Sequence, residues 1–191
     1  MTFLCTRVKL HRQLIVATAA EIADLNGLEK VTLTAVANHL GVRKPSLYNH
    51  INGLPELKAE LAIWGTNQLC VIISDAAIGK AKQDAIAAIA NAYRLFAKKR
   101  PGLYRAIVSA PDRDNLDLKA ASQKLMAILS IVLEPYNLGA TDETHAIRGL
   151  RSLMHGFASL EEAGWFAKPI DREESYRELI NIFIRGIESL C

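Results

Sequence analysis

Apolar residues recur along this chain at the three- and four-residue spacing that marks one face of an α-helix. No stretch shows the sustained alternation of apolar and polar residues that a half-buried strand requires. Pro and Gly fall between the periodic segments, with few exceptions, which is where helices end. The pattern therefore predicts an all-α protein of about nine helices. We expect them at about residues 9–26, 33–40, 44–50, 55–78, 82–100, 101–110, 116–134, 142–163 and 171–190.

Several helix ends carry residues with a specific capping role. Thr32 is expected to N-cap the second helix, and Gly41 is expected to end it with the positive φ that glycine adopts without strain. Gly27 is expected to close the first helix in the left-handed conformation. Asp171 and Glu174 have the spacing of a capping box, so they are expected to open the last helix.

The helices fall into a short N-terminal unit and a longer C-terminal unit. Residues 1–54 hold three short helices, and the long helix at 55–78 is expected to connect them to the rest of a unit at 55–191. The helix at 171–190 has an apolar face wider than one flank of a core requires. We therefore expect a homodimer formed through helices near 142–163 and 171–190. The alternative is a last helix buried within its own domain.

Composition narrows the class of protein only slightly. The chain has 191 residues, of which 50% are hydrophobic and 23% charged, an ordinary globular balance, and its net charge of +3 is too small to indicate nucleic acid by itself. The three cysteines, Cys5, Cys70 and Cys191, form no CxxC pair, so neither a disulfide framework nor a zinc site is expected, and a reducing cytoplasm fits best. The chain has neither the start of a secretory signal nor an apolar run of about 18 residues, so no membrane span is expected.

The second and third predicted helices, joined by a tight turn at Gly41, form a helix-turn-helix pattern. In such a motif the second helix lies in the major groove of DNA. No acidic residue lies between Glu29 and Glu56, so this surface is locally cationic. Each polar residue here, taken alone, is more often a solvated or packing residue, but the whole pattern favours contacts to phosphates and bases. The expected DNA-binding residues are Thr32, Arg43, Lys44, Pro45, Ser46, Tyr48, Asn49 and His50.

The stretch VTLTAVANHLGVRKPSLYNHI resembles the DNA-binding domain of the tetracycline-repressor (TetR) family of bacterial transcription regulators. The resemblance implies a three-helix DNA-binding domain, a helical ligand-binding and dimerisation domain, and repression relieved by a small molecule. It also implies phosphate contacts from Thr32, Tyr48 and His50, with base contacts from residues just before Leu47. Two positions depart from the family pattern. Arg43 stands where Ser or Thr usually caps the recognition helix, and Leu54 stands where a lysine usually opens the fourth helix, with Lys58 one turn further on.

The C-terminal part is similar to a WHG-type TetR regulatory domain, through RLFAKKRPGLYRAI and GLRSLMHGFASLEEAGWF. Met154, rather than an aromatic residue, precedes His155 and Gly156. We expect a largely apolar effector pocket among the fifth to eighth helices, and the lack of an evident buried charge favours a neutral or weakly polar effector. Large apolar residues are more often core than pocket, so a purely structural role is the alternative for each candidate. The candidate ligand-binding residues are Tyr93, Phe96, Tyr104, Met126, His155, Phe157 and Trp165.

The sequence favours a regulator over two other classes of protein. The first alternative is a helical ligand-binding or structural protein whose helix-turn-helix does not bind DNA. An enzyme is disfavoured, because the chain has no GxGxxG, Walker A, HExxH or GxSxG motif, and no catalytic residues are expected. His145 and His155 are ten residues apart, which places them on somewhat different sides of a helix, so we expect no metal site. No cofactor is expected either.

Overall fold

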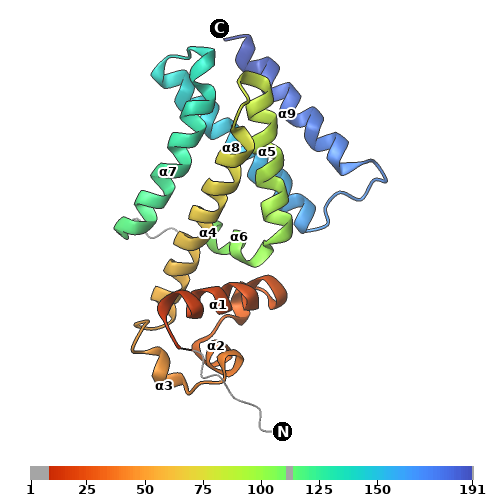
Figure 1. Ribbon diagram of the computed structural model, residues 1–191. Coiled ribbons are helices and arrows are strands. Elements are labelled where there is room, and N and C mark those ends of the chain that lie inside the picture. The colour runs from red at the N-terminus through yellow and green to blue at the C-terminus, as the bar shows by residue number, and fades with distance from the viewer. Residues whose placement is uncertain (1–8, 111–113, 191) are drawn as a thin grey trace.

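The computed structural model of the chain describes residues 9–110 and 114–190, and all regular structure within them is helical. The prediction of an all-α protein with nine helices is confirmed for these residues. A small group of helices, α1 to α3, lies at one end, and α4 runs from it into a larger group (Figure 1). The α-helices are α1 (Arg12–Asn26), α2 (Leu33–Leu40), α3 (Lys44–Leu47), α4 (Leu54–Ala77), α5 (Lys82–Lys99), α6 (Pro101–Val108), α7 (Leu116–Leu133), α8 (Ala140–Glu162) and α9 (Arg172–Glu188). Two 3₁₀ turns, Leu28–Lys30 and Glu134–Tyr136, follow α1 and α7.

The small group is held together by apolar side chains that the helical periodicity places on one face of each helix. Ile15 of α1, Val36 of α2 and Leu47 of α3 are fully buried, and so is Leu57 in the first turns of α4. These side chains belong to one apolar cluster that continues through the larger group to α9. Because burying an aliphatic side chain stabilises a fold by about 1.5–3 kcal/mol, this cluster fixes the small group against α4.

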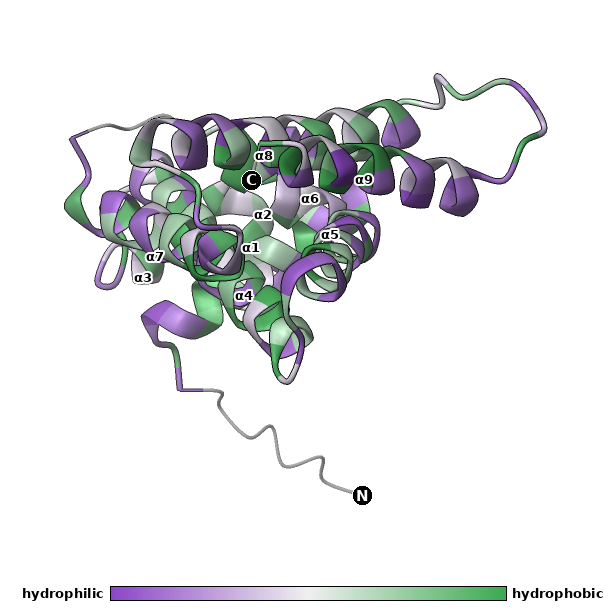
Figure 2. Cartoon of the chain, turned by 90° about the horizontal axis from the view of Figure 1, so that it is seen from above, coloured by the Kyte–Doolittle hydropathy of each residue, from purple (hydrophilic) through white to green (hydrophobic). Residues whose placement is uncertain are grey.

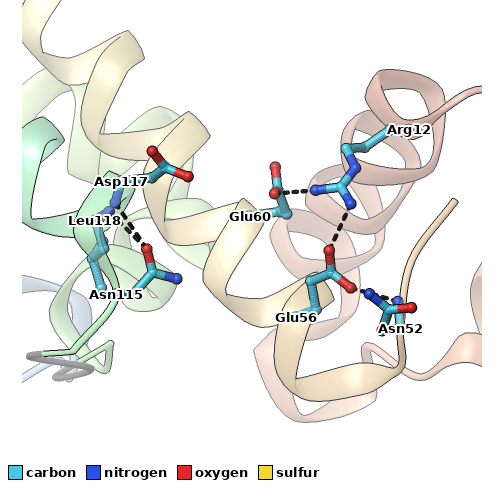
Figure 3. A network of polar contacts seen from close by, with 7 residues as sticks. All are labelled: Arg12, Asn52, Glu56, Glu60, Asn115, Asp117 and Leu118. Atoms are coloured by element: carbon cyan, nitrogen blue, oxygen red, sulfur yellow. Dashed lines mark hydrogen bonds and ion pairs between the residues drawn. The ribbon is translucent and has the colours of Figure 1, made fainter.

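An ion-pair network joins α1 to the start of α4 (Figure 3). The guanidinium of Arg12 bonds Glu56 at 2.6 Å and Glu60 at 2.5 Å, and the second oxygen of Glu56 accepts the backbone N–H of Asn52. The hydrogen bond from Asn52, together with Arg12, holds the pKa of Glu56 below its usual range. Asn52 lies in the turn between α3 and α4, so the network ties α1, this turn and α4 to one another.

In the larger group, α4 is flanked by α5, α6 and α7, while α8 and α9 lie outermost. Figure 2 shows α8 and α9 side by side along one edge of the molecule. The sequence places Ile86 and Ile89 of α5 one turn apart, and both are fully buried, as are Leu103 of α6 and Leu150 of α8. The fully buried Leu129 of α7 completes this part of the core.

A close approach of α6 to α1 couples the two groups. A Cβ atom at Gly102 would lie 2.0 Å from the carbonyl carbon of Ala23, so only glycine fits where the helices meet. Asp24 of α1 accepts the backbone N–H of Leu103 at 2.9 Å, and its other oxygen pairs with Arg100. A carboxylate near a helix N-terminus satisfies a free N–H group and interacts favourably with the helix dipole. The last turns of α1 thus cap α6.

Two helix boundaries lie three residues from their predicted positions, and the others lie within two. The first helix begins at Arg12 rather than Lys9, because the side chain of His11 accepts the backbone N–H of Leu14 and acts as the N-cap. The third helix ends at Leu47 rather than His50. Beyond it the chain forms a turn, in which the N–H of His50 bonds the carbonyl of Leu47.

The predicted caps were partly correct. Gly27 has a positive φ of 94° but an extended ψ of 151°, so it is not left-handed helical as expected, because the chain turns there into a 3₁₀ segment. Asp171 does cap α9, since its side chain accepts the N–H of Glu173. Glu174 instead bonds Arg177 on the helix surface, so the capping box is not completed.

Candidate nucleic-acid interface and ligand cavity

The turn between α2 and α3 has the geometry that the sequence predicts. The hydroxyl oxygen of Thr32 accepts the N–H of Ala35 at 3.0 Å and caps α2. At the other end, Gly41 adopts φ 66° and ψ 28°, and the N–H of Val42 bonds the carbonyl of Ala37 at 3.0 Å. These bonds satisfy backbone groups that a helix end leaves free and set the direction in which α3 leaves the turn.

The short helix α3 buries one residue and exposes most of the others. Leu47 is 0% exposed, whereas Tyr48, the next residue, is 50% exposed. A helix of four residues that buries only leucine gains little from packing, so its remaining side chains are available for contacts. Of the predicted DNA-binding residues, Ser46 and His50 are half-buried. The exposed ones are Thr32, Arg43, Lys44, Pro45, Tyr48 and Asn49.

This exposed surface is cationic. Arg43 and Lys44 have no carboxylate within 4 Å among residues 9–110 and 114–190, and Glu56, the next acid along the chain, is already bonded to Arg12. The hydroxyl of Thr32 uses a lone pair for its cap, which leaves its hydrogen available to donate to a phosphate oxygen. The arrangement matches the chemistry of a nucleic-acid backbone.

The start of α4 lies beside this surface. Leu54 is the first residue of the helix and is half-buried, so it offers no charge where the family pattern has lysine. Lys58 is exposed and lines a groove together with Glu29 and Arg105.

A cavity of about 450 Å³ lies where α4, α5, α6, α7 and α8 meet, within the size range of small-molecule sites. Tyr93 and His155, two of the predicted ligand-binding residues, line it. Behind them, Tyr104 joins the two: its hydroxyl lies 3.1 Å from that of Tyr93 and 2.6 Å from Nδ1 of His155. Burial raises the pKa of Tyr93 and Tyr104, so both stay neutral hydroxyl groups.

The other predicted ligand-binding residues lie further from this cavity. Met126 of α7 contacts Arg151 through its sulfur at 3.6 Å, and Phe96 is buried in the core. Phe157 packs against Tyr176, with its ring centroid 4.8 Å away, between α8 and α9. Trp165 is 74% exposed in the connection between α8 and α9 and does not line the cavity.

The cavity is more polar than the sequence led us to expect. Arg148, Arg151 and Ser152 of α8 line it together with His155, because these positions share one side of the helix. The spacing was visible in the sequence, but which side of α8 faces the cavity was not. A buried charge that the sequence did not reveal lies outside this cavity: Arg94 is 6% exposed and pairs with Glu161 at 2.7 Å.

No group of three or more His, Cys, Asp or Glu side chains in the described part of the chain is arranged to hold a metal ion. No helix between residues 9 and 190, the short gap at 111–113 aside, has the length and hydropathy needed to cross a membrane. Cys70 is a buried free thiol, and Cys5 and Cys191 lie outside the described residues.

A three-helix unit with an exposed cationic segment, joined by a long helix to a larger helical bundle, defines a helix-turn-helix regulator. Residues 86–183 match the model of the tetracyclin repressor-like C-terminal domain. The chain is 35% identical over 181 residues to the HTH-type transcriptional regulator YobS of Bacillus subtilis, covering 95% of this chain and 94% of that protein. It is 31% identical to the HTH-type transcriptional regulator Rv0681 of Mycobacterium tuberculosis, covering 94% and 83%.

Solved structures agree with these relatives in fold. The transcriptional regulator SCO7222, a TetR from Streptomyces coelicolor, superposes with a TM-score of 0.77 at 19% identity, covering 95% of this chain and 99% of that one. The chain therefore belongs to the TetR family of HTH-type transcriptional regulators.

Proposed function

We propose that this protein is a homodimeric repressor that a small-molecule effector releases from a pseudo-palindromic operator. The observation that carries the proposal is the exposed cationic surface around α3, which the buried Leu47 anchors and the turn at Gly41 directs outward. In this proposal residues 1–54 form the DNA-binding domain and residues 55–191 the effector-binding and dimerisation domain.

The residues around α3 divide by the chemistry that each one offers. Arg43 and Lys44 supply positive charge, and Tyr48 supplies a hydroxyl on an exposed ring. Ser46 and Asn49 offer groups that both donate and accept, which suits base edges as well as phosphates. Thr32, Pro45 and His50 border this surface and complete the set of proposed contacts.

Exposed apolar side chains on α8 and α9 support dimerisation. Ile182 of α9 is 63% exposed, and Leu160 of α8 and Leu190 beyond α9 are also exposed. The two helices lie side by side along one edge of the molecule (Figure 2), so a second copy packed on this edge would cover such side chains. Two copies that pair through these helices form a four-helix interface about a two-fold axis. The two α3 segments would then enter successive major grooves, roughly 34 Å apart.

The contact between α6 and α1 couples the cavity to the DNA-binding domain, so that effector binding can release the operator. Ile107 and Val108, at the end of α6, line the cavity, and Gly102, at its start, packs on the backbone of α1. An effector that requires a different position of α6 therefore also requires a different position of α1. Since such coupling is reciprocal, operator DNA must weaken effector binding by the same factor.

Binding to the promoter region beside the protein's own gene tests the proposal. A gel-shift titration in excess nonspecific competitor is expected to show saturable binding whose affinity falls steeply as salt increases, because phosphate contacts release counterions. If binding disappears with competitor, the protein is instead a helical ligand-binding or structural protein whose helix-turn-helix does not read DNA.

A further inference from the structure

The cavity between α6, α7 and α8 combines an apolar wall with a positively charged edge. Leu69 of α4, Ile107 of α6 and Leu125 of α7 form the apolar wall. Arg148 and Arg151 of α8 also line the cavity and are exposed, so their charges stand where it opens to solvent. A site of this shape receives a molecule that has one apolar part and one charged end.

Among residues 9–110 and 114–190, no carboxylate neutralises the two arginines. No Asp or Glu is among the described residues that line the cavity, and neither arginine forms an ion pair there; Arg151 contacts only the weakly accepting sulfur of Met126. Like charges three residues apart on a helix repel each other, so a bound anion would relieve this repulsion. Six other arginines of the described chain do have acidic partners, namely Arg12, Arg94, Arg100, Arg105, Arg177 and Arg185, whereas Arg43 and Arg172 have none within 4 Å among the described residues.

Neutral polar groups extend the site inward from the arginines. Tyr93 and His155 line the cavity and are linked through the hydroxyl of Tyr104. Two of the three protons of this hydrogen-bonded group are used in its own hydrogen bonds, so either the phenol of Tyr93 or the imidazole of His155 can donate to an oxygen of a ligand without adding negative charge.

We infer that the effector is an amphipathic carboxylic acid, bound through its carboxylate to Arg148 and Arg151 and through its apolar body to Leu69, Ile107 and Leu125. The planar guanidinium matches a carboxylate with two parallel hydrogen bonds, and charge-assisted bonds of this kind are about twice as strong as neutral ones. This inference rests on the proposed function, since it names the class of effector for the same protein.

Calorimetric titration of the full chain with matched acids and amides tests the inference without DNA. The probes are octanoate and 4-phenylbutyrate, each compared with its primary amide, which keeps the shape and removes the charge. We expect the acids to bind and the amides to bind at least about tenfold more weakly, as the loss of a charged hydrogen bond implies. The double variant Arg148→Gln, Arg151→Gln should lose a similar factor for the acids. Arg177→Gln, which removes an exposed arginine of α9 from a different cavity, should bind them normally.

Three results would overturn the inference: equal affinity of acid and amide for the unmodified protein, unchanged octanoate affinity in the double variant, or no binding by either acid. The first comparison needs no substitution, so it stands even if the double variant misfolds, which circular dichroism and light scattering would reveal. Acid binding without release of the operator would support the inferred ligand class and contradict the proposed release mechanism. Failure to bind any operator would count against the proposed function alone.

Discussion

Single residues in the helix-turn-helix decide where the exposed segment points. Gly41 is left-handed, with φ 66°, and, apart from its two neighbours in the chain, no described residue has a heavy atom within 4 Å of the place where its Cβ would stand. Space is therefore available for a side chain, and the backbone conformation alone restricts this position. An L-residue with a branched Cβ resists that conformation most strongly.

Gly41→Val is expected to lower the free energy of unfolding by about 1–2 kcal/mol and to weaken operator binding, because the turn must relax or remain strained. Urea denaturation measures the first effect and a gel shift the second. Gly41→Asn is the matched control, since asparagine tolerates the left-handed region and should lose clearly less stability. A valine variant as stable as the unmodified protein would show that the turn does not constrain α3.

A second residue-scale feature is the buried ion pair between α5 and α8. Arg94 donates to both oxygens of Glu161, at 2.8 and 2.7 Å, and holds the pKa of that carboxyl below its usual range. The guanidinium also lies over the rings of Phe157 and Tyr176. Because the unfolded chain lacks these bonds, the pair stabilises the fold fully above the ordinary glutamate pKa of about 4.3. That stabilisation is lost as the pH falls through the lower pKa of the folded state.

Glu161→Gln is therefore expected to reduce the free energy of unfolding by about 3 kcal/mol at pH 7, since it leaves a buried arginine without its counter-charge. The difference in the free energy of unfolding between the variant and the unmodified protein should become smaller as the pH falls below about 4, where the native carboxyl itself takes up a proton. Denaturant titrations at pH 7 and pH 3.5 measure both values. The same difference at the two pH values would mean that the charge of Glu161 does not contribute.

At the scale of helices, local signals predicted most of the fold. Thr32, Gly41 and Asp171 cap their helices as expected, because capping depends on residues within one turn. The third helix was predicted too long because its periodicity continues: Leu47 and Ile51 are both buried although the chain between them is a turn. Periodicity indicates which side chains are buried, and here the periodic buried positions continue beyond the end of the helix.

Sequence patterns could not predict the contacts between helices that lie far apart along the chain. Asp24 and Leu103 are 79 residues apart, and Arg94 and Glu161 are 67 apart. No local rule pairs such residues, because only the packing of whole helices brings them together. The same reason explains why the exposed residues around α3 could be predicted within one short motif, whereas the cavity residue Arg148 was missed.

The α1–α6 junction gives a prediction at this scale. Gly102→Ala is expected to destabilise the protein by about 1–3 kcal/mol, because the added methyl group meets the backbone of Ala23, which cannot move without shifting α1. Chemical denaturation measures the effect. Gly139→Ala is the control: its φ of −64° suits any residue and its surroundings are open, so it should change stability by less than about 0.5 kcal/mol. Equal effects of the two substitutions would show that the close approach is unimportant.

For the molecule as a whole, the proposal requires two copies paired through α8 and α9. Ile182→Glu is expected to halve the mass measured by light scattering at low micromolar concentration, because an unpaired carboxylate inside an apolar interface is strongly unfavourable. Leu25→Glu on α1 is the control, since Leu25 is 78% exposed and α1 packs on α2, α4 and α6. A dimer that survives Ile182→Glu but not Leu25→Glu would place the interface elsewhere.

The central claim is that the surface around α3 reads DNA. Its most direct test is operator affinity, measured by fluorescence anisotropy, for the double variant Lys44→Ala, Tyr48→Ala. We expect at least about a 100-fold loss, since a dimer would lose four contacts, while helical content and thermal melting stay nearly unchanged because both side chains are exposed. Lys119→Ala, an exposed lysine on α7, should bind like the unmodified protein. Unimpaired operator binding by the double variant would contradict the account.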